Sequence, residues 1–295
     1  PARAFDRAIG TEPTSNLARR FGALAAINGA PFVPNGPYAG APTGAYQWNG
    51  QVVAGGGASR PALLLCDPRS SRRADLDTVD LRARVTAADG QSLDLQGINR
   101  PRTGADDLVL YTPFLGPRTL TAPGGQEAIL DLQNRVNALA EANAEIPSDG
   151  SVLSGAGAAA AFLRDRASVG SALRIEASLA PQTTPAISGC QATDVIAAGP
   201  ILVDNAQPAS FSDSDAANRT ARSAFALTDR NTWLFVTVDG RQASSAGMRL
   251  AEFADELVRL GAVRAVNLDG GNSTTLVVND VVRNQPSAGE EIEVG

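Results

Sequence analysis

Two aspartates follow short apolar runs in the last quarter of the chain, and each begins an Asp-Gly pair. Asp239 comes directly after the run 233–238, and Asp269 comes directly after the run 263–268. Two carboxylates at a suitable separation can cleave a glycosidic bond, one as acid or base and the other as nucleophile or charge stabiliser. Taken alone, the two Asp-Gly pairs could equally be ordinary turns.

The segment between these aspartates predicts how they are positioned. Apolar residues recur there at helical spacing, which predicts an amphipathic helix over 249–260 with Gly261 as its C-cap. A helix of this length between two strands favours a parallel pair, and parallel strands end at the same edge of a sheet. The strand backbones would lie about 5 Å apart as neighbours and about 10 Å apart with one strand between them. These two separations bracket those of the carboxylate pairs that cleave glycosidic bonds.

Two arginines are expected at the same edge. Arg222 opens the predicted strand 223–227, which can form a hairpin with 233–238 and bring Arg222 close to Asp239 and Arg241. Two arginines beside two aspartates form either a structural ion-pair network or an anion-binding catalytic site.

Further polar groups follow the predicted strands. The turn 270–274, Gly-Gly-Asn-Ser-Thr, can present backbone N–H groups and hydroxyls to an anion. Asn28 ends a third predicted strand over 23–27, where Asn-Gly is also a simple turn signal.

Composition excludes several kinds of chemistry. The 295 residues include no His, all 25 basic residues are Arg, and the net charge is −6. This excludes Ser-His-Asp and Cys-His catalysis and lysine Schiff bases, and it argues against nucleic-acid binding.

No apolar run reaches membrane-spanning length. Cys66 and Cys190 cannot form a zinc site alone, so they are either buried thiols or one disulfide. No signal peptide is visible, and we expect that one has been removed.

The middle of the chain is predicted to form mainly β-structure. Residues 79–135 alternate with period two, which predicts half-buried antiparallel strands. Residues 127–143 fit either a helix or a strand and turn. Arg100 and Arg102 could clamp an anion, although an ordinary surface loop is the default interpretation.

A glycine motif raises a dinucleotide-binding alternative. Gly155 and Gly157 match a dinucleotide fingerprint with Ala in the third position. The strand before them is short and no repeating βαβ pattern surrounds them, so a helix start with small residues is the better interpretation.

Five short segments together resemble the phosphodiester glycosidase family, whose best-known member removes N-acetylglucosamine from a phosphodiester. They are 27–32, 222–226, 238–241, 247–250 and 267–274, and the last, Asn-Leu-Asp-Gly-Gly-Asn-Ser-Thr, is the strongest. The sequence departs from the family pattern at Ala30 and Asn272, where the family has glycine. It also has Thr220-Ala221 in place of His-Pro.

The resemblance and the residues together predict the fold and the activity. We expect one α+β domain over 1–295, with a mixed β-sheet flanked by helices and an antiparallel β elaboration at about 60–190. The expected activity is that of a secreted or periplasmic bacterial hydrolase, a glycosidase that cleaves sugar-1-phosphodiester or related linkages in a cell-envelope glycan or exopolysaccharide. Its partner would be a carbohydrate or sugar phosphate, and the oligomeric state stays open.

The same resemblance implies roles for site residues. Asp239, Asp269 and Arg222 are expected to be catalytic. A second set is expected to bind substrate: Asn28, Gly29, Arg241, Asn267, Gly270, Gly271, Ser273 and Thr274. No cofactor is expected. A Ca²⁺ or Mg²⁺ ion on the two aspartates stays open, although the nearby arginines argue against one.

Two other functions remain as alternatives. The chain could be a non-catalytic glycan- or cell-envelope-binding module that keeps the pocket, or a dinucleotide-binding enzyme that uses Gly155 and Gly157.

Overall fold

The computed structural model describes residues 2–66, 73–183, 192–212 and 214–295, so Cys190 lies outside the described residues. The described chain is mostly β-strand, arranged in sheets of twelve, five, three and two strands. The expectation of a mixed sheet flanked by helices is therefore only partly correct. Helix α5 (Leu250–Arg259) covers one face of the five-stranded sheet, but the opposite face packs on strands.

The five-stranded sheet carries both predicted aspartates. Its order is β16-β15-β19-β17-β18, and β17 pairs antiparallel with both β18 and β19. The two strands that precede the aspartates are therefore parallel with one strand between them, which is one of the two predicted arrangements. The bounds are β15 (Ile201–Asp204), β16 (Gln207–Pro208), β17 (Arg222–Thr228), β18 (Trp233–Val238) and β19 (Ala262–Asn267).

Helix α5 connects β18 to β19 as predicted from its apolar spacing. Phe253, Ala254 and Leu257 are fully buried against the sheet. At the N-terminus the Glu252 carboxylate accepts a hydrogen bond from the Arg249 N–H, and Gly261 follows the C-terminus with a φ of +89°. Apolar residues on the other face of the sheet, such as Phe225 and Val266, pack on β5 (Arg60–Cys66) and β6 (Ala74–Thr86).

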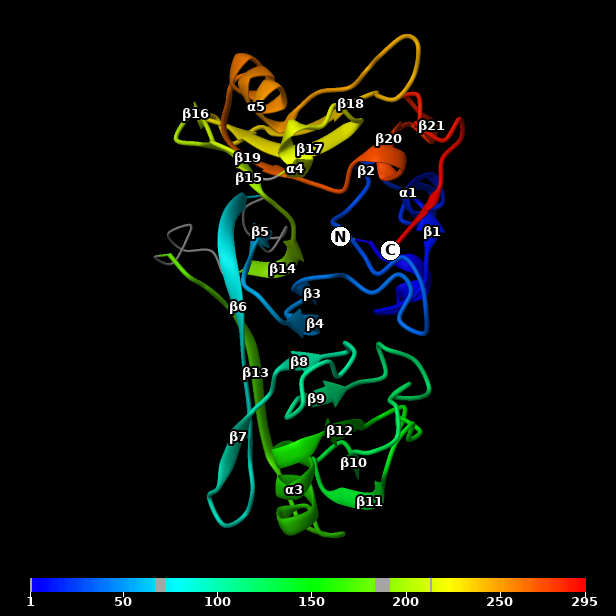
Figure 1. Cartoon of the computed structure of the whole chain (residues 1–295), viewed down its shortest axis with the longest axis vertical. Helices are drawn as coiled ribbons and strands as arrows, with labels where there is room; N and C mark the ends of the chain where they lie inside the picture. Colours follow the sequence, from blue (N-terminus) through cyan, green and yellow to red (C-terminus); the bar gives the residue numbers. More distant parts are fainter. Residues whose placement is uncertain (1, 67–72, 184–191, 213) are drawn as a thin grey trace.

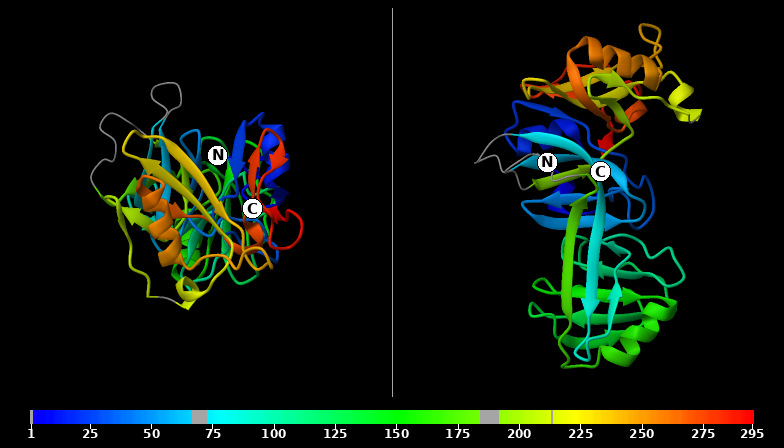
Figure 2. Two further views of the ribbon diagram at one scale, coloured as in Figure 1. Left: turned by 90° about the horizontal axis from the view of Figure 1, so that it is seen from above. Right: turned by 90° about the vertical axis from the view of Figure 1, so that its left-hand side faces the viewer.

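The twelve-stranded sheet contains the predicted β elaboration. Its order is β11-β10-β12-β9-β8-β4-β3-β14-β5-β6-β13, with β7 (Ser92–Asp94) also paired to β6. All pairs are antiparallel except β8 with β9. The long strands β6 and β13 run between the middle of the molecule and the end that carries α3 (Figures 1 and 2). The other bounds are β3 (Tyr46–Trp48), β4 (Gln51–Gly56), β8 (Gly97–Ile98), β9 (Leu108–Tyr111), β10 (Gln126–Leu130), β11 (Val136–Ala140), β12 (Ser151–Gly155), α3 (Gly157–Arg166), β13 (Arg174–Pro181) and β14 (Ala192–Ala197).

Two predictions are decided in this sheet. Residues 127–143 form β10 and β11 joined by a turn, so the strand alternative is correct.

Strand β12 and helix α3 hold the Gly155–Gly157 motif, but β12 pairs antiparallel with both neighbours and lacks the parallel βαβ unit of a dinucleotide fold. The Asp106 carboxylate also accepts the Ala158 N–H, at the helix start where a pyrophosphate would bind.

Short elements close the middle of the molecule, where both termini lie (Figure 1). Strand β2 is shorter than predicted and only half-buried, because it pairs on one side alone, with β20. The bounds are η1 (Ala4–Asp6), β1 (Glu12–Pro13), α1 (Thr14–Arg20), β2 (Ala25–Ile27), η2 (Gly271–Ser273), β20 (Leu276–Val278), β21 (Val281–Val282) and β22 (Glu293–Val294). The short helix α4 (Ser214–Ala217) lies instead with the five-stranded sheet, where Ala216 belongs to the same apolar cluster as α5.

Cys66 ends β5, is buried and is disulfide-bonded. Among the described helices, none has the length and apolar character required to cross a membrane.

Candidate active site

Asp239 stands at the end of β18, one residue past the pair formed by Val238 and Arg222. Its Oδ1 accepts two hydrogen bonds, from the Asn284 side-chain amide at 3.2 Å and from the Gln285 N–H at 3.0 Å. Its backbone oxygen accepts the Ser245 hydroxyl at 2.6 Å. Contacts on both the carboxylate and the backbone therefore hold Asp239 in place.

Asp269 follows β19 at the same edge of the sheet. Its backbone N–H donates to the Gly29 oxygen at 3.0 Å, and its backbone oxygen accepts the Asn28 side-chain amide at 2.7 Å. The carboxylate accepts the Gly270 N–H at 3.1 Å and the Ser273 hydroxyl. Burial raises the pKa of the Asp269 carboxyl, and these two hydrogen bonds only partly oppose the effect. The environment of Asp269 is thus that of a carboxylic acid that keeps its proton to a higher pH than an ordinary aspartate does.

The strand order determines the separation of the two aspartates. Since β17 lies between β18 and β19, their backbones are about 10 Å apart. The Asn284 amide donates both to Asp239 and to the Thr274 oxygen, so one side chain connects the two strand ends.

The two arginines occupy different environments. Arg222 is buried, and its guanidinium donates to the backbone oxygens of Met248 and Asn218 at 3.0 and 2.8 Å. Arg241 is exposed at a φ of +59°. The Arg241 guanidinium nitrogens lie 3.5 Å from the point that a Gly271 Cβ would occupy. Arg241 therefore lies against the glycine turn with its charge open to solvent, whereas Arg222 connects loops around the sheet edge.

The glycine turn is tightly bound within the protein. The Gly271 N–H donates to the Ala221 oxygen at 2.9 Å, and the Gly270 N–H donates to Asp269. A Cβ on Gly270 would come within 2.8 Å of the Ala221 oxygen, so a larger residue would not fit. Ser273 and Thr274 are buried, and the Thr274 hydroxyl has no hydrogen-bond partner within the described chain. The turn positions Asp269, and its two glycine N–H groups are already in use.

Asn28 and Asn267 lie behind the aspartates. Asn28 is 1% exposed, and its Oδ1 accepts the Ser223 hydroxyl at 2.7 Å and the Thr275 N–H at 3.1 Å. The Asn267 amide donates to the Gly199 and Leu268 backbone oxygens. Asn28 therefore binds three chain segments together at the point where the strand with Asp269 ends.

Two hollows border this region. The lining of an open cleft of about 490 Å³ includes Gln242, Asn284, Gln285 and Glu290, and of these Asn284 and Gln285 donate hydrogen bonds to Asp239. These amides and carboxylates suit sugar hydroxyls. A second cavity, of about 410 Å³, borders Asn28 and Gly29, but side chains such as Phe225, Phe235 and Leu63 make its lining mainly apolar.

Asn284, Gln285 and Ser245 were not predicted from the sequence. All three contact Asp239, yet Asn284 and Gln285 are about 45 residues away in the chain. Asn-Gln before a proline has no recognisable chemical pattern, so only the folded contacts reveal them.

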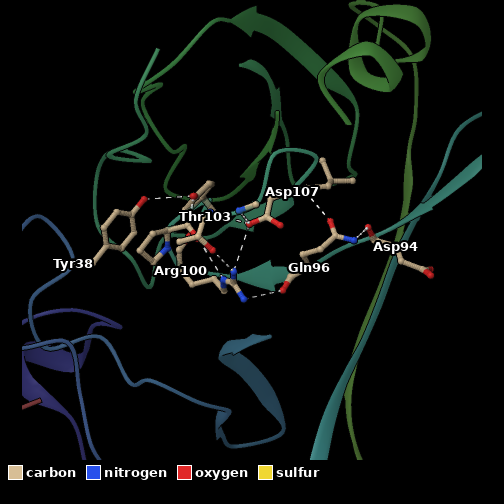
Figure 3. Close-up of polar contacts among 10 residues, drawn as sticks. Tyr38, Asp94, Gln96, Arg100, Thr103 and Asp107 are labelled. Atoms are coloured by element: carbon tan, nitrogen blue, oxygen red, sulfur yellow. Dashed lines mark hydrogen bonds and ion pairs between the residues drawn. The ribbon is translucent and has the colours of Figure 1, made fainter. Parts of the chain in front are cut away.

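Arg100 and Arg102 lie far from this site. They belong to an ordinary structural loop, which was the default interpretation of the sequence. The Arg100 guanidinium contacts the Gln96 oxygen, the Thr103 hydroxyl and Asp107, whose Oδ2 also accepts the Thr103 N–H (Figure 3). Arg102 donates to two backbone oxygens, 2.6 and 2.8 Å away. Both guanidinium groups are thus engaged with the protein.

Within the described ranges, no group of three or more Cys, Asp or Glu side chains is arranged to hold a metal ion. Asp239 and Asp269 are instead held by amide, hydroxyl and N–H donors.

The raised pKa of Asp269 predicts how stability changes with pH. A carboxyl with a higher pKa in the folded state contributes stability that is present below its unfolded pKa of about 3.9 and is lost as pH rises through the folded pKa. Asp269→Asn should therefore gain in Tm relative to wild type as pH rises from about 3.5 to 8. Thermal unfolding across this range tests it, with the exposed Asp255→Asn as charge control. A Tm difference that does not change with pH would contradict the assignment of Asp269 as an acid with a raised pKa.

Comparisons with known proteins identify the family of this chain. The family model for phosphodiester glycosidases matches residues 127–295, which include both aspartates and both site arginines. A hypothetical protein of Synechocystis has a similar structure, with a TM-score of 0.83 and 25% identity over 99% of this chain. The chain spans only 54% of that relative. No curated protein sequence matches significantly.

Two further solved structures are similar to different degrees. A Burkholderia pseudomallei protein, described as a candidate exported protein, has a TM-score of 0.83 and 30% identity over 98% of this chain and 68% of its own. The zebrafish N-acetylglucosamine-1-phosphodiester alpha-N-acetylglucosaminidase catalytic domain, auto-inhibited by its pro-peptide, has 13% identity over 90% of this chain and 81% of its own. Its TM-score of 0.29 is too low to support an argument. The family match over more than half of the chain shows that this protein belongs to the phosphodiester glycosidase family.

Proposed function

We propose that this protein is a glycosidase that hydrolyses a sugar-1-phosphodiester linkage at the edge formed by β18 and β19. The observation that carries the proposal is the pair of differently held aspartates at the ends of two parallel strands, with the exposed Arg241 beside them. Membership of the phosphodiester glycosidase family supports the same reaction.

The chemistry follows from the environment of each group. Burial raises the pKa of the Asp269 carboxyl, which favours its protonated form, so Asp269 is assigned as the acid that donates a proton to the phosphate oxygen that leaves C1 of the sugar. Asp239 faces the positive charge that develops at C1, either stabilising it or attacking C1. Water replaces the phosphate oxygen at C1 and supplies the proton that restores Asp269. The products are the free sugar and a phosphate monoester.

The phosphate is assigned to Arg241. Its guanidinium is exposed beside the turn that carries Asp269, whereas the Arg222 guanidinium is buried against backbone oxygens. In this proposal Arg222 positions the loops around Asp239, and Asn28 and Asn267 hold the strand end that carries Asp269. Gly270, Gly271, Ser273 and Thr274 shape the turn, and the Gly29 oxygen holds the Asp269 N–H.

We also propose that this hydrolase acts outside the cytoplasm on an extracellular or cell-envelope glycan. The description of the Burkholderia relative as a candidate exported protein supports export. The disulfide at Cys66 suits an oxidising compartment.

Arg241→Ala tests the phosphate assignment. Losing one charge-assisted contact should lower kcat/KM for sugar-1-phosphodiesters by about ten- to hundredfold, with little effect on neutral aryl glycosides. Wild type and variant are compared on a panel of both substrate classes. The control is Arg230→Ala, an exposed arginine in the turn between β17 and β18, at the opposite end of that hairpin.

The panel has three informative outcomes. Cleavage of phosphodiesters that depends on Arg241 supports the proposal. Cleavage of neutral glycosides with Arg241→Ala fully active would make this an ordinary glycoside hydrolase. Absence of turnover, with sugar phosphate still bound, would favour the glycan-binding module.

A further inference from the structure

Asn284 contacts the candidate catalytic centre from a segment outside every recognised motif. It follows β21 and approaches the sheet edge from the side of the small β2-β20-β21 sheet. Its side chain makes three hydrogen bonds, to Asp239 Oδ1 at 3.2 Å, to the Thr274 oxygen at 2.9 Å and from the Leu276 N–H at 2.8 Å.

These three bonds determine the orientation of the amide. The Leu276 N–H can only donate, so the group facing it must be the amide oxygen. The NH₂ group then points at two acceptors, Asp239 and Thr274, and uses both of its N–H bonds. Rotating the amide by 180° would place donor against donor and acceptor against acceptor.

The bonds also connect the two halves of the site. Asp239 belongs to the end of β18, whereas Thr274 belongs to the turn that follows Asp269. Only Oδ1 of Asp239 has hydrogen-bond partners within the described chain, Asn284 and the Gln285 N–H, which leaves Oδ2 for substrate.

We propose that Asn284 is a positioning residue, which sets the angle of the Asp239 carboxylate relative to the Asp269 turn without touching the reacting atoms. The inference rests on the proposed function. A small misplacement of a catalytic group can lower turnover by about a hundredfold, because reacting atoms must be aligned within a fraction of an ångström. Asn284 therefore acts on the reaction through Asp239.

The first test is a split between kcat and KM. Asn284→Ala and the isosteric Asn284→Asp, which cannot donate to Asp239, should each lower kcat by about ten- to hundredfold and change KM less than about twofold. Val281→Ala, an exposed side chain on the same hairpin, controls for loosening of this segment. Unchanged kcat in both Asn284 variants would overturn the proposal.

The second test is a double-mutant cycle with Asp239. If Asn284 acts through Asp239, Asn284→Ala should have little effect on the residual kcat in an Asp239→Asn background. Additive losses would show that Asn284 acts independently and would overturn the inference.

A third measurement separates this inference from the proposed function. If wild type cleaves no substrate on the panel, the proposed function fails, but the contact can still be measured by thermal unfolding. Asn284→Ala combined with Asp239→Ala should then lower Tm by less than the sum of the two single shifts, because the shared hydrogen bond is lost only once. Additive Tm shifts would contradict the positioning contact even in an inactive protein.

Discussion

Asp269→Asn is expected to lower kcat for a sugar-1-phosphodiester by about 10²- to 10⁴-fold, the usual contribution of a positioned general acid. Asparagine keeps the size of the side chain and can still accept the Gly270 N–H, but it has no proton to give to the leaving oxygen. Binding of a sugar phosphate should persist, because Arg241 and the turn remain. Initial rates and equilibrium binding on the same variant measure both quantities.

A charge-matched control accompanies this variant. Asp255→Asn removes one carboxylate from the exposed face of α5 and should leave kcat unchanged. If Asp269→Asn retained full turnover while Asp239→Asn lost it, Asp269 would be a structural acid, and the proton would have to come from another group.

Phe253→Ala is expected to lower the free energy of unfolding by about 3 to 5 kcal/mol, the range for deleting a fully buried aromatic ring. Phe253 is 0% exposed where α5 packs on the five-stranded sheet. Since α5 joins β18 to β19, a cavity under it loosens the connection between the two strands that carry the aspartates.

Denaturant unfolding of Phe253→Ala and Leu260→Ala makes the comparison. Leu260 directly follows the same helix and is 50% exposed, so its truncation should cost less than about 1 kcal/mol. Equal losses in both variants would mean that burial of the helix face does not control stability here.

The strands, helix and turn at the site were predictable because they depend on neighbours in the sequence. Phe253 and Leu257 recur at helical spacing, and Gly261 provides the backbone conformation that ends the helix. Local patterns also place Asp239 and Asp269 directly after strands. The register of Arg222 against Val238 followed from a hairpin, which is itself a local structure.

Other features required contacts between distant segments. Residues 127–143 have helical composition, yet β10 pairs with β12, about 25 residues further on, and these sheet contacts override the helical propensity. The prediction of a sheet flanked by helices was only partly correct for the same reason. The face of the five-stranded sheet opposite α5 packs on the strands β5 and β6.

By itself, the sequence determined the chemical groups of this protein and their order along the chain: two aspartates after strands, two arginines, a glycine turn, and no histidine or lysine. Only the tertiary structure decided which groups are buried and which face solvent. It placed β17 between the two strands, partly buried Asp269 so that its pKa rises, buried Arg222, left Arg241 exposed, and brought Asn284 to Asp239. Burial and long-range hydrogen bonds arise from segments that are far apart in sequence, so no local pattern encodes them.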